Sequence, residues 1–162
     1  MNGPDQRTSR NAVLHLYIDG ASKANPGEAG AGIWITDEKG SRIAELSQYL
    51  GRKTNNEAEY WALILGLRAV RQHGGETVRI FTDSELVERQ IKGRYRVRNS
   101  NLKLLYDTVV KELEGFSTWD IQAIPREENR EADRKANQAI RQGIAEKKKK
   151  GEGRKETDGR LF

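Results

Sequence analysis

Alternating and continuous runs of apolar residues divide the first fifty residues into three predicted strands. Residues 12–19 carry apolar side chains on both faces, which is typical of a central strand. Residues 30–36 and 42–50 form the second and third predicted strands, and the short polar segment 37–40 joins them as a hairpin loop. The segment between the first two strands is rich in glycine and small residues and contains the turn signal Asn25-Pro26-Gly27.

Helical and strand-like patterns alternate in the rest of the chain. Polar capping residues mark where helices begin, and glycines mark where they end. The predicted elements are a helix capped by Thr54 that ends near Gly74 and Gly75, a strand over 77–82, a short helix after Ser84 that stops at Gly93, a helix capped by Asn99 or Ser100 that runs through Leu113, a strand over 118–124 and a last helix over 130–145.

This order of elements predicts an α/β fold with a five-stranded mixed sheet flanked by helices. Three sequential strands favour an antiparallel meander, whereas strands reached through helices favour parallel crossovers. The strands that end in Asp19 and Asp83 are then parallel neighbours. Ligands of such sheets bind beyond the carboxyl ends of the strands, where both aspartates lie.

The composition fits one compact domain with polar ends. Of the 162 residues, 35% are hydrophobic and none is cysteine, which excludes disulfides and thiolate metal sites. We expect a flexible N-terminus over residues 1–11, one domain over 12–145 and a basic, disordered tail over 146–162. Without a long apolar segment or signal sequence, we expect a soluble, cytoplasmic protein that does not enter a membrane.

Basic residues exceed acidic ones, 29 to 24, and their distribution suggests a polyanionic partner. The segment 89–105 contains Arg94, Arg96 and Arg98 together with three further basic residues, and no acid. Such a stripe is typical of a nucleic-acid contact. A solvated loop surface is the alternative explanation.

Four carboxylates lie at predicted element ends and suggest divalent-metal chemistry. Asp19 and Asp83 end strands, while Glu59 and Asp133 begin helices. Acids at element ends can converge in space, and a cluster of like charges repels itself unless a cation joins it. Each acid taken alone is also explained as a turn, cap or first-turn residue.

Two glutamates compete for the position in the first helix. Glu57 heads a row that becomes charged along the helix, whereas Glu59 heads an apolar row through Leu63 and Leu67. We therefore predict that Glu59 faces the cluster. Asp133 has Ala136 and Ile140 below it at helical spacing and borders a packed face.

These motifs together resemble the type 1 ribonuclease H family over residues 12–145. The resemblance is carried by Asp19-Gly20-Ala21 with Asn25-Pro26-Gly27, by Thr54-Asn55-Asn56 followed by Glu59, by Thr82-Asp83-Ser84, and by Asn129 with Ala132-Asp133. It implies an endonuclease that cuts the RNA strand of RNA–DNA hybrids and leaves 5′-phosphate and 3′-hydroxyl ends. It also implies two Mg²⁺ ions, with Mn²⁺ as a substitute, held by Asp19, Glu59, Asp83 and Asp133. We expect the protein to be a monomer.

The resemblance further implies substrate contacts. Asn25, Asn55 and Asn56 match positions that contact the hybrid, while Arg52, Thr54 and Asn99 resemble a pocket for a phosphate of the DNA strand. Turn and cap chemistry also explains the asparagines and Thr54. We expect Arg94, Arg96 and Arg98 to replace in part the long basic insertion that some members carry.

The chain departs from the family in the loop before the last helix. Many members have a catalytic histidine there, whereas this loop contains Glu127 and Glu128, either of which is a candidate substitute. The two histidines, His15 and His73, lie inside a predicted strand and at a helix end, where structural or exposed positions are expected. We expect no separate hybrid-binding domain.

Two other functions remain open from the sequence. One is another nuclease of the same superfamily, such as a resolvase or transposase core. The other is a non-catalytic module that binds RNA–DNA hybrid or double-stranded RNA; the presence of all four carboxylates counts against it.

Overall fold

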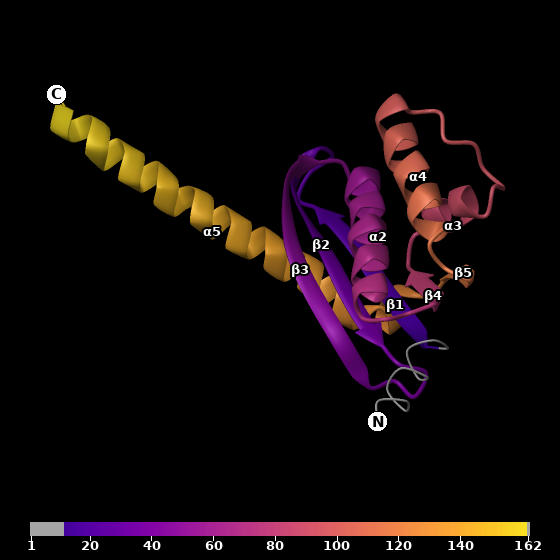
Figure 1. The fold of residues 1–162 in the computed structure, drawn as a ribbon. Coiled ribbons are helices and arrows are strands. Elements are labelled where there is room, and N and C mark those ends of the chain that lie inside the picture. Colours follow the sequence, from indigo (N-terminus) through magenta and orange to yellow (C-terminus); the bar gives the residue numbers. More distant parts are fainter. Residues whose placement is uncertain (1–11, 162) are drawn as a thin grey trace.

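Five strands form one mixed sheet that positions the rest of the molecule (Figure 1). The computed structural model describes the backbone of residues 12–161 and the side chains of residues 12–151. The strands are β1 (Val13–Ser22), β2 (Gly27–Thr36), β3 (Arg42–Lys53), β4 (Thr77–Thr82) and β5 (Thr118–Ala123). The helices are α2 (Asn55–Gln72), α3 (Glu85–Ile91), α4 (Ser100–Leu113), the 3₁₀ helix η1 (Arg126–Glu128) and α5 (Arg130–Leu161).

The strand order is β3-β2-β1-β4-β5, with β1 in the centre. β2 pairs antiparallel with both β1 and β3, whereas β4 pairs in parallel with β1 and β5. This arrangement confirms the predicted fold class and the parallel pairing of the strands that lead to Asp19 and Asp83. It also confirms the predicted sequence of elements.

The main core lies between the sheet and the helices α2 and α4. Leu16 and Ile18 of β1 and Ile33 of β2 are fully buried there, as are Leu63 and Leu67 of α2. α5 covers the opposite sheet face over β2, β3 and β1 (Figure 1). Two differently covered faces meet at the end of β1, where helices from both sides contribute side chains.

β2 begins at Gly27, whereas the sequence predicted that the second strand begins at residue 30. Gly30 and Gly32 lie in β2, and a Cβ atom on Gly32 would stand 1.9 Å from the carbonyl oxygen of Ala132 in α5. The glycines therefore allow the backbone of α5 to approach the sheet. Glycine weakens strand propensity, so local preference alone could not reveal this packing.

The last helix continues past Ala145, where we expected it to end and a disordered tail to follow. α5 runs through Leu161, so the backbone of residues 146–161 is helical. Ala145, Glu146 and the lysines after it are strong helix formers. Lys147 also ties this part to the body, because its Nζ lies 3.0 Å from Glu28 Oε1.

The proposed division at residue 145 stays a prediction, and the flexible N-terminus over residues 1–11 lies outside the described residues. Within the described part of the chain, none of the helices has both the length and the apolar character needed to cross a membrane.

Candidate active site

Three of the four predicted carboxylates meet at the carboxyl end of the two central parallel strands. Asp19 lies inside β1, which continues to Ser22 and does not end at residue 19 as predicted. Asp83 follows β4, and Glu59 lies near the start of α2, just after its first turn. Each offers one oxygen atom, and these three atoms lie within 4.8 Å of one another. Asp133, in the first turn of α5, lines the same cavity of about 620 Å³. We call this cavity the carboxylate pocket.

Glu59 reaches Asp19 because α2 approaches β1 very closely at Gly20. A Cβ atom on Gly20 would lie 2.2 Å from the carbonyl carbon of Ala58, so only glycine permits this contact. The Gly20 amide donates to Glu59 Oε1 at 2.7 Å, and Thr82 Oγ1 donates to Glu59 Oε2 at 3.3 Å. These two hydrogen bonds hold the carboxylate in one orientation.

Glu57 has a structural role at the start of the same helix. Its amide donates to Thr54 Oγ1 at 3.1 Å, and its carboxylate accepts from the Thr54 amide at 2.9 Å. The pair forms a capping box. The choice of Glu59 over Glu57 as the buried acid of the cluster therefore agrees with the geometry.

Asp133 is placed by the packing of α5 and by two polar neighbours. The Asp133 amide donates to the carbonyl oxygen of Asn129 at 3.1 Å, which begins the helix. Asn137 Nδ2 donates to the Asp133 carboxylate at 3.3 Å, and Arg126 Nη2 lies 3.5 Å from it. Arg126 and Asn137 also line the carboxylate pocket.

Burial and mutual repulsion make the cluster hold protons. Burial, reinforced by the neighbouring charges of Glu59 and Asp83, raises the pKa of Asp19 to about 10. Burial also raises the pKa of Glu59 to about 7, against the lowering effect of the Gly20 hydrogen bond. The pKa of Asp83 is raised by burial as well, while hydrogen bonding to Asn129 and the charge of Arg126 oppose this.

The donor set fits divalent cations. Asp19 and Glu59 are each only 6% exposed, and carboxylate oxygens are the preferred ligands of hard cations such as Mg²⁺. A cation would replace the shared protons and remove the repulsion among the acids. Asp19, Glu59 and Asp83 form the group that could hold such an ion, with Asp133 at its border.

Asn129 is a buried residue that acts on the surroundings of Asp19 and Asp83. It is 1% exposed, and its Nδ2 donates to the carbonyl oxygen of Ile18 at 2.8 Å, directly before Asp19. Asn129 also opposes the rise in the pKa of Asp83 and so favours the charged form of that carboxylate. One buried carboxamide thus links the ends of β1 and β4.

The predicted substrate asparagines gather beside the carboxylate pocket. Asn25 Oδ1 accepts from the Asn55 amide at 3.0 Å, and Asn55 Oδ1 accepts from the Ser22 amide at 3.1 Å. Asn55 and Asn56 line the pocket. The side-chain oxygens of Asn25 and Asn55 therefore connect the turn after β1 to α2. The side-chain N–H groups of these two residues are the atoms that would contact a substrate.

The residues predicted to bind a DNA phosphate have mixed positions. Thr54 caps α2 and Asn99 caps α4, where Asn99 Oδ1 accepts from the amides of Asn101 at 2.9 Å and Leu102 at 3.1 Å. Arg52 is exposed near the end of β3. The capping roles are thus observed, and the phosphate role stays a prediction.

The basic stripe forms a surface of its own between α3 and α4. Arg94 and Arg96 line a cavity of about 590 Å³ together with Tyr95, Lys103 and Tyr106. Arg98 is exposed in the same segment. Cationic and aromatic side chains lie together here, since Arg89 lies 5.3 Å from the Tyr95 ring and Lys103 lies 5.0 Å from the Tyr106 ring.

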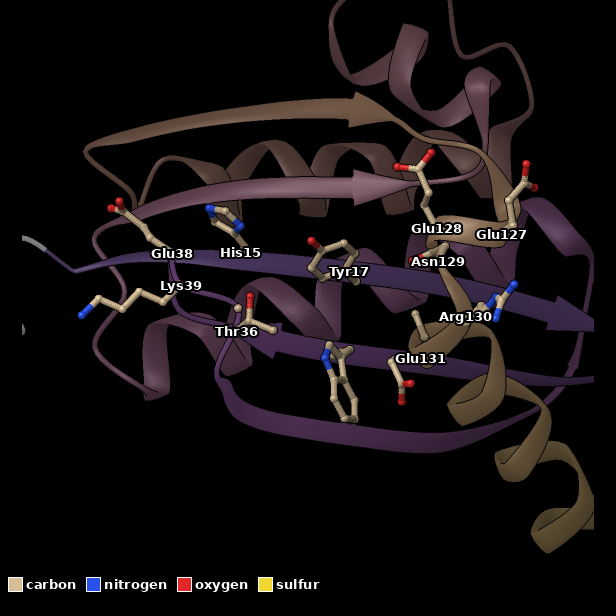
Figure 2. A pocket seen from close by; sticks show the side chains of 13 residues that line it. His15, Tyr17, Thr36, Glu38, Lys39, Glu127, Glu128, Asn129, Arg130 and Glu131 are labelled. Carbon is tan, nitrogen blue, oxygen red and sulfur yellow. The ribbon is translucent and has the colours of Figure 1, made fainter.

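The candidate substitutes for the loop histidine do not join the carboxylates. Among the described residues, Arg126 is the side chain of η1 that lines the carboxylate pocket, whereas Glu127 and Glu128 line a different cavity (Figure 2). His15 lines that second cavity too, and His73 is exposed with its Nδ1 2.9 Å from the carbonyl oxygen of Ala69. Neither histidine lines the carboxylate pocket.

Sequence reasoning missed Arg126 and Asn137 at the carboxylate pocket. Arg126 directly precedes the two glutamates that we considered, and arginine is the usual partner of phosphate groups. Asn137 lies one helical turn after Asp133, so its spacing was the signal that could have identified it.

Comparisons with known proteins agree with this geometry. The family model described as "Reverse transcriptase-like" matches residues 17–139. The chain is 38% identical over 131 residues to a protein named Ribonuclease HI of Halobacterium salinarum, covering 81% of this chain and 66% of that protein. It is 39% identical over 127 residues to Bifunctional protein Rv2228c of Mycobacterium tuberculosis, covering 77% of this chain and 35% of that protein.

A solved structure shares the fold over nearly its full length. The crystal structure of LC11-RNase H1 in complex with RNA/DNA hybrid matches with a TM-score of 0.78 and 38% identity, covering 81% of this chain and 99% of that chain. The chain spans less than two thirds of the length of each of the two relatives named above. The complete activities of those longer proteins are therefore not assigned to this chain.

Proposed function

Because this chain belongs to the ribonuclease H family, we propose that it is an endonuclease that hydrolyses the RNA strand of RNA–DNA hybrids. The observation that carries the proposal is the meeting of Asp19, Glu59 and Asp83 within 4.8 Å at the carboxyl ends of β1 and β4. Asp133 borders the same pocket. The match to a ribonuclease solved with RNA/DNA hybrid supports this substrate.

In this proposal the four carboxylates bind two Mg²⁺ ions, with Mn²⁺ as a possible replacement. Bound cations of this kind activate water and stabilise the leaving 3′ oxygen of a phosphodiester. The chain's own contribution is to hold the ligands in place. The Gly20 amide orients Glu59, and Asn129 secures the backbone before Asp19 and the carboxylate of Asp83.

Other residues would position the substrate. Arg126 is 77% exposed at the edge of the pocket and would neutralise phosphate charge beside Asp133. Asn25, Asn55 and Asn56 would use their N–H groups toward 2′-hydroxyl oxygens, which distinguish RNA from DNA. We assign phosphate contacts to Arg52, Thr54 and Asn99, and contacts along the duplex to Arg94, Arg96 and Arg98.

We further propose that the protein acts as a monomer in the cytoplasm. Double-stranded RNA is a second substrate to test, because its A-form shape and 2′-hydroxyl groups resemble those of the RNA strand in a hybrid.

Cleavage assays test the proposed reaction. The purified chain is given end-labelled RNA–DNA hybrid, double-stranded RNA, single-stranded RNA and double-stranded DNA, each with Mg²⁺ and with a chelator. We expect cleavage inside the RNA strand of the hybrid, dependent on the cation and leaving 5′-phosphate ends. Asp19→Asn should abolish this cleavage while hybrid binding remains. Binding of hybrid without cation-dependent cleavage would instead support a non-catalytic binding module.

A further inference from the structure

A second cavity, of about 550 Å³, lies on the sheet face beside the beginning of α5 (Figure 2). We call it the rear pocket. It is bounded by β1, by the hairpin between β2 and β3, and by residues 127–132. None of the four carboxylates assigned to cations lines it, so its chemistry requires a separate explanation.

Aromatic rings form the floor of the rear pocket. Tyr17 lies in the middle of the cavity (Figure 2). Its ring stacks on that of Phe81, with centroids 4.8 Å apart and 20° between the planes. Trp34 is the direct cross-strand partner of Tyr17 and is half-buried. The guanidinium of Arg42 lies 6.0 Å from the Trp34 ring. Flat π faces of this kind favour planar and cationic groups.

The rim carries an excess of negative charge. Glu38, Glu127, Glu128 and Glu131 line the cavity with only Lys39 and Arg130 as cations. Glu131 is paired with Arg134 at 2.5 Å, whereas within residues 12–151 no ion pair involves Glu127 or Glu128. A positively charged occupant would therefore be attracted.

A buried acceptor without a donor lies in the wall. Asn129 Oδ1 is enclosed and has no hydrogen-bond partner among the described residues. The orientation of the carboxamide is set at its other end, where Nδ2 donates to the Ile18 carbonyl oxygen. Asn129 belongs to the lining of the rear pocket, and an N–H donor that reached this enclosed oxygen would satisfy it.

One chemical group matches the ring faces, the carboxylates and the unpaired acceptor of the rear pocket. A guanidinium is planar, permanently charged and rich in N–H donors, whereas an ammonium lacks the plane and a neutral base lacks the charge. We propose that the rear pocket binds an arginine side chain carried by a basic segment of a partner protein.

An arginine bound in the rear pocket would affect the carboxylate pocket through Asn129, which lies between the two. A donor on Oδ1 polarises the carboxamide and strengthens the hydrogen bond from its Nδ2 to the Ile18 carbonyl oxygen. This consequence rests on the proposed nuclease function, whereas arginine binding itself does not.

Nuclear magnetic resonance of the isotope-labelled full chain tests the binding. The probe is the peptide acetyl-Gly-Arg-Gly-amide, added in excess Mg²⁺ so that the acidic cluster does not compete for the guanidinium. We expect saturable shifts of the Trp34 indole N–H and of the Asn129 side-chain amide. Matched peptides with lysine or the uncharged isostere citrulline should bind about tenfold more weakly.

Two variants and a control complete the test. Glu127→Gln combined with Glu128→Gln should weaken arginine-peptide binding about tenfold, because two carboxylate partners are lost. Trp34→Leu should weaken it by removing a ring face. Glu85→Gln makes one of the same charge changes at an exposed position of α3, away from the rear pocket, and should bind the peptide as the unchanged chain does.

Three results would overturn the proposal: equal binding of all three peptides, shifts confined to the carboxylate pocket, or full affinity in the double glutamine variant. None of these readouts depends on hybrid cleavage. Failure of arginine binding is therefore distinguishable from failure of the nuclease assignment.

Discussion

Asp19 lies in an environment that strongly opposes ionisation of its carboxyl group. It is 6% exposed and lies beside two further acids, and its pKa is raised to about 10 by burial first and by those charges second. An unfolded chain ionises the same group near 3.8. As pH rises from that value, the unfolded state is increasingly favoured by the free energy of ionisation, and the cation-free fold loses stability.

Asp19→Asn should therefore stabilise the cation-free protein as pH rises. Asparagine keeps the size of the side chain and removes the group that resists ionisation. In a chelator, the midpoint of thermal unfolding should exceed that of the unchanged chain by at least about 2 °C at pH 8, and by less at pH 5. Thermal unfolding followed by circular dichroism measures this. The burial argument would be contradicted if the gain in unfolding midpoint over the unchanged chain were smaller at pH 8 than at pH 5.

Glu59 and Glu57 lie two residues apart and should respond very differently to the same change. Glu59→Gln removes a charge from the acidic cluster and should lower kcat at least about 100-fold, since even hydrogen-bonded neighbours of metal ligands are worth about 10–100-fold. Glu57→Gln retains an acceptor for the Thr54 amide, so turnover should stay near that of the unchanged chain. Steady-state kinetics on labelled hybrid measure both, and the reverse order would place the wrong helix face at the pocket.

Arg126 is the loop side chain that we expect to matter for turnover. Arg126→Ala should lower kcat about tenfold, because a charge-assisted contact to phosphate is lost. Glu127→Gln and Glu128→Gln should each have a smaller effect, since these side chains line the rear pocket. Single-turnover rates on hybrid provide the measurement. A larger loss from either glutamine variant would identify that glutamate as the substitute for the loop histidine.

At the scale of elements, the site depends on how closely helices approach the sheet. α2 contacts β1 at Gly20, and α5 contacts β2 at Gly32. These two contacts bring Glu59 and Asp133 toward strand ends that carry Asp19 and Asp83. The spacing between helix and sheet is therefore part of the site.

Gly32→Ala should damage both stability and cleavage. The new methyl group would lie 1.9 Å from the Ala132 carbonyl oxygen, which forces the first turn of α5 and Asp133 away from the sheet. We expect a loss of about 1–3 kcal/mol in the free energy of unfolding, together with a fall in kcat. Denaturant unfolding and hybrid cleavage measure the two effects.

Gly151→Ala is the matched control for this substitution. Its Cβ would meet no atom within 4 Å, and the residue lies in helical backbone. Alanine should therefore leave cleavage unchanged and add up to about 1 kcal/mol of stability. Equal damage from both alanine variants would show that the approach of α5 at Gly32 is not what matters.

For the whole molecule, the acidic cluster and the basic stripe lie at separate places. The acids lie together at the end of β1, while Arg94 and Arg96 line a separate cavity between α3 and α4. A duplex that contacted both the carboxylate pocket and the basic stripe would be bound in part at a distance from the reacting phosphate. Binding and turnover should then respond to different substitutions.

Replacing Arg94, Arg96 and Arg98 together by alanine should raise KM and affect kcat less. The slope of log affinity against log salt should fall by about 0.9 for each arginine that contacts a phosphate. Equilibrium binding of hybrid at several salt concentrations measures the slope. As a control, alanine at Arg68 and Arg71 should leave the slope nearly unchanged, because both guanidiniums pair with Glu112. Equal slopes in both variants would indicate a merely solvated loop.

The sequence by itself determined the order and direction of the elements and the choice of acids. Thr54 caps α2, Asp19 and Asp83 follow the stretch over which β1 and β4 pair in parallel, and Glu59 faces the packed side of its helix. These features depend on the capping, periodicity and strand-end preferences of residues that are close together in the chain. Local chemistry was sufficient to predict them.

Only the tertiary structure decided which residues face the acids and which face the rear pocket. Arg126 and Glu127 are adjacent in sequence, yet they line different cavities, because the turn of η1 separates their side chains. Likewise, only the packed structure brings the backbone of α5 against Gly32 of β2. Contacts between distant segments depend on packing of the whole chain, and local preference at any one residue carries no information about them.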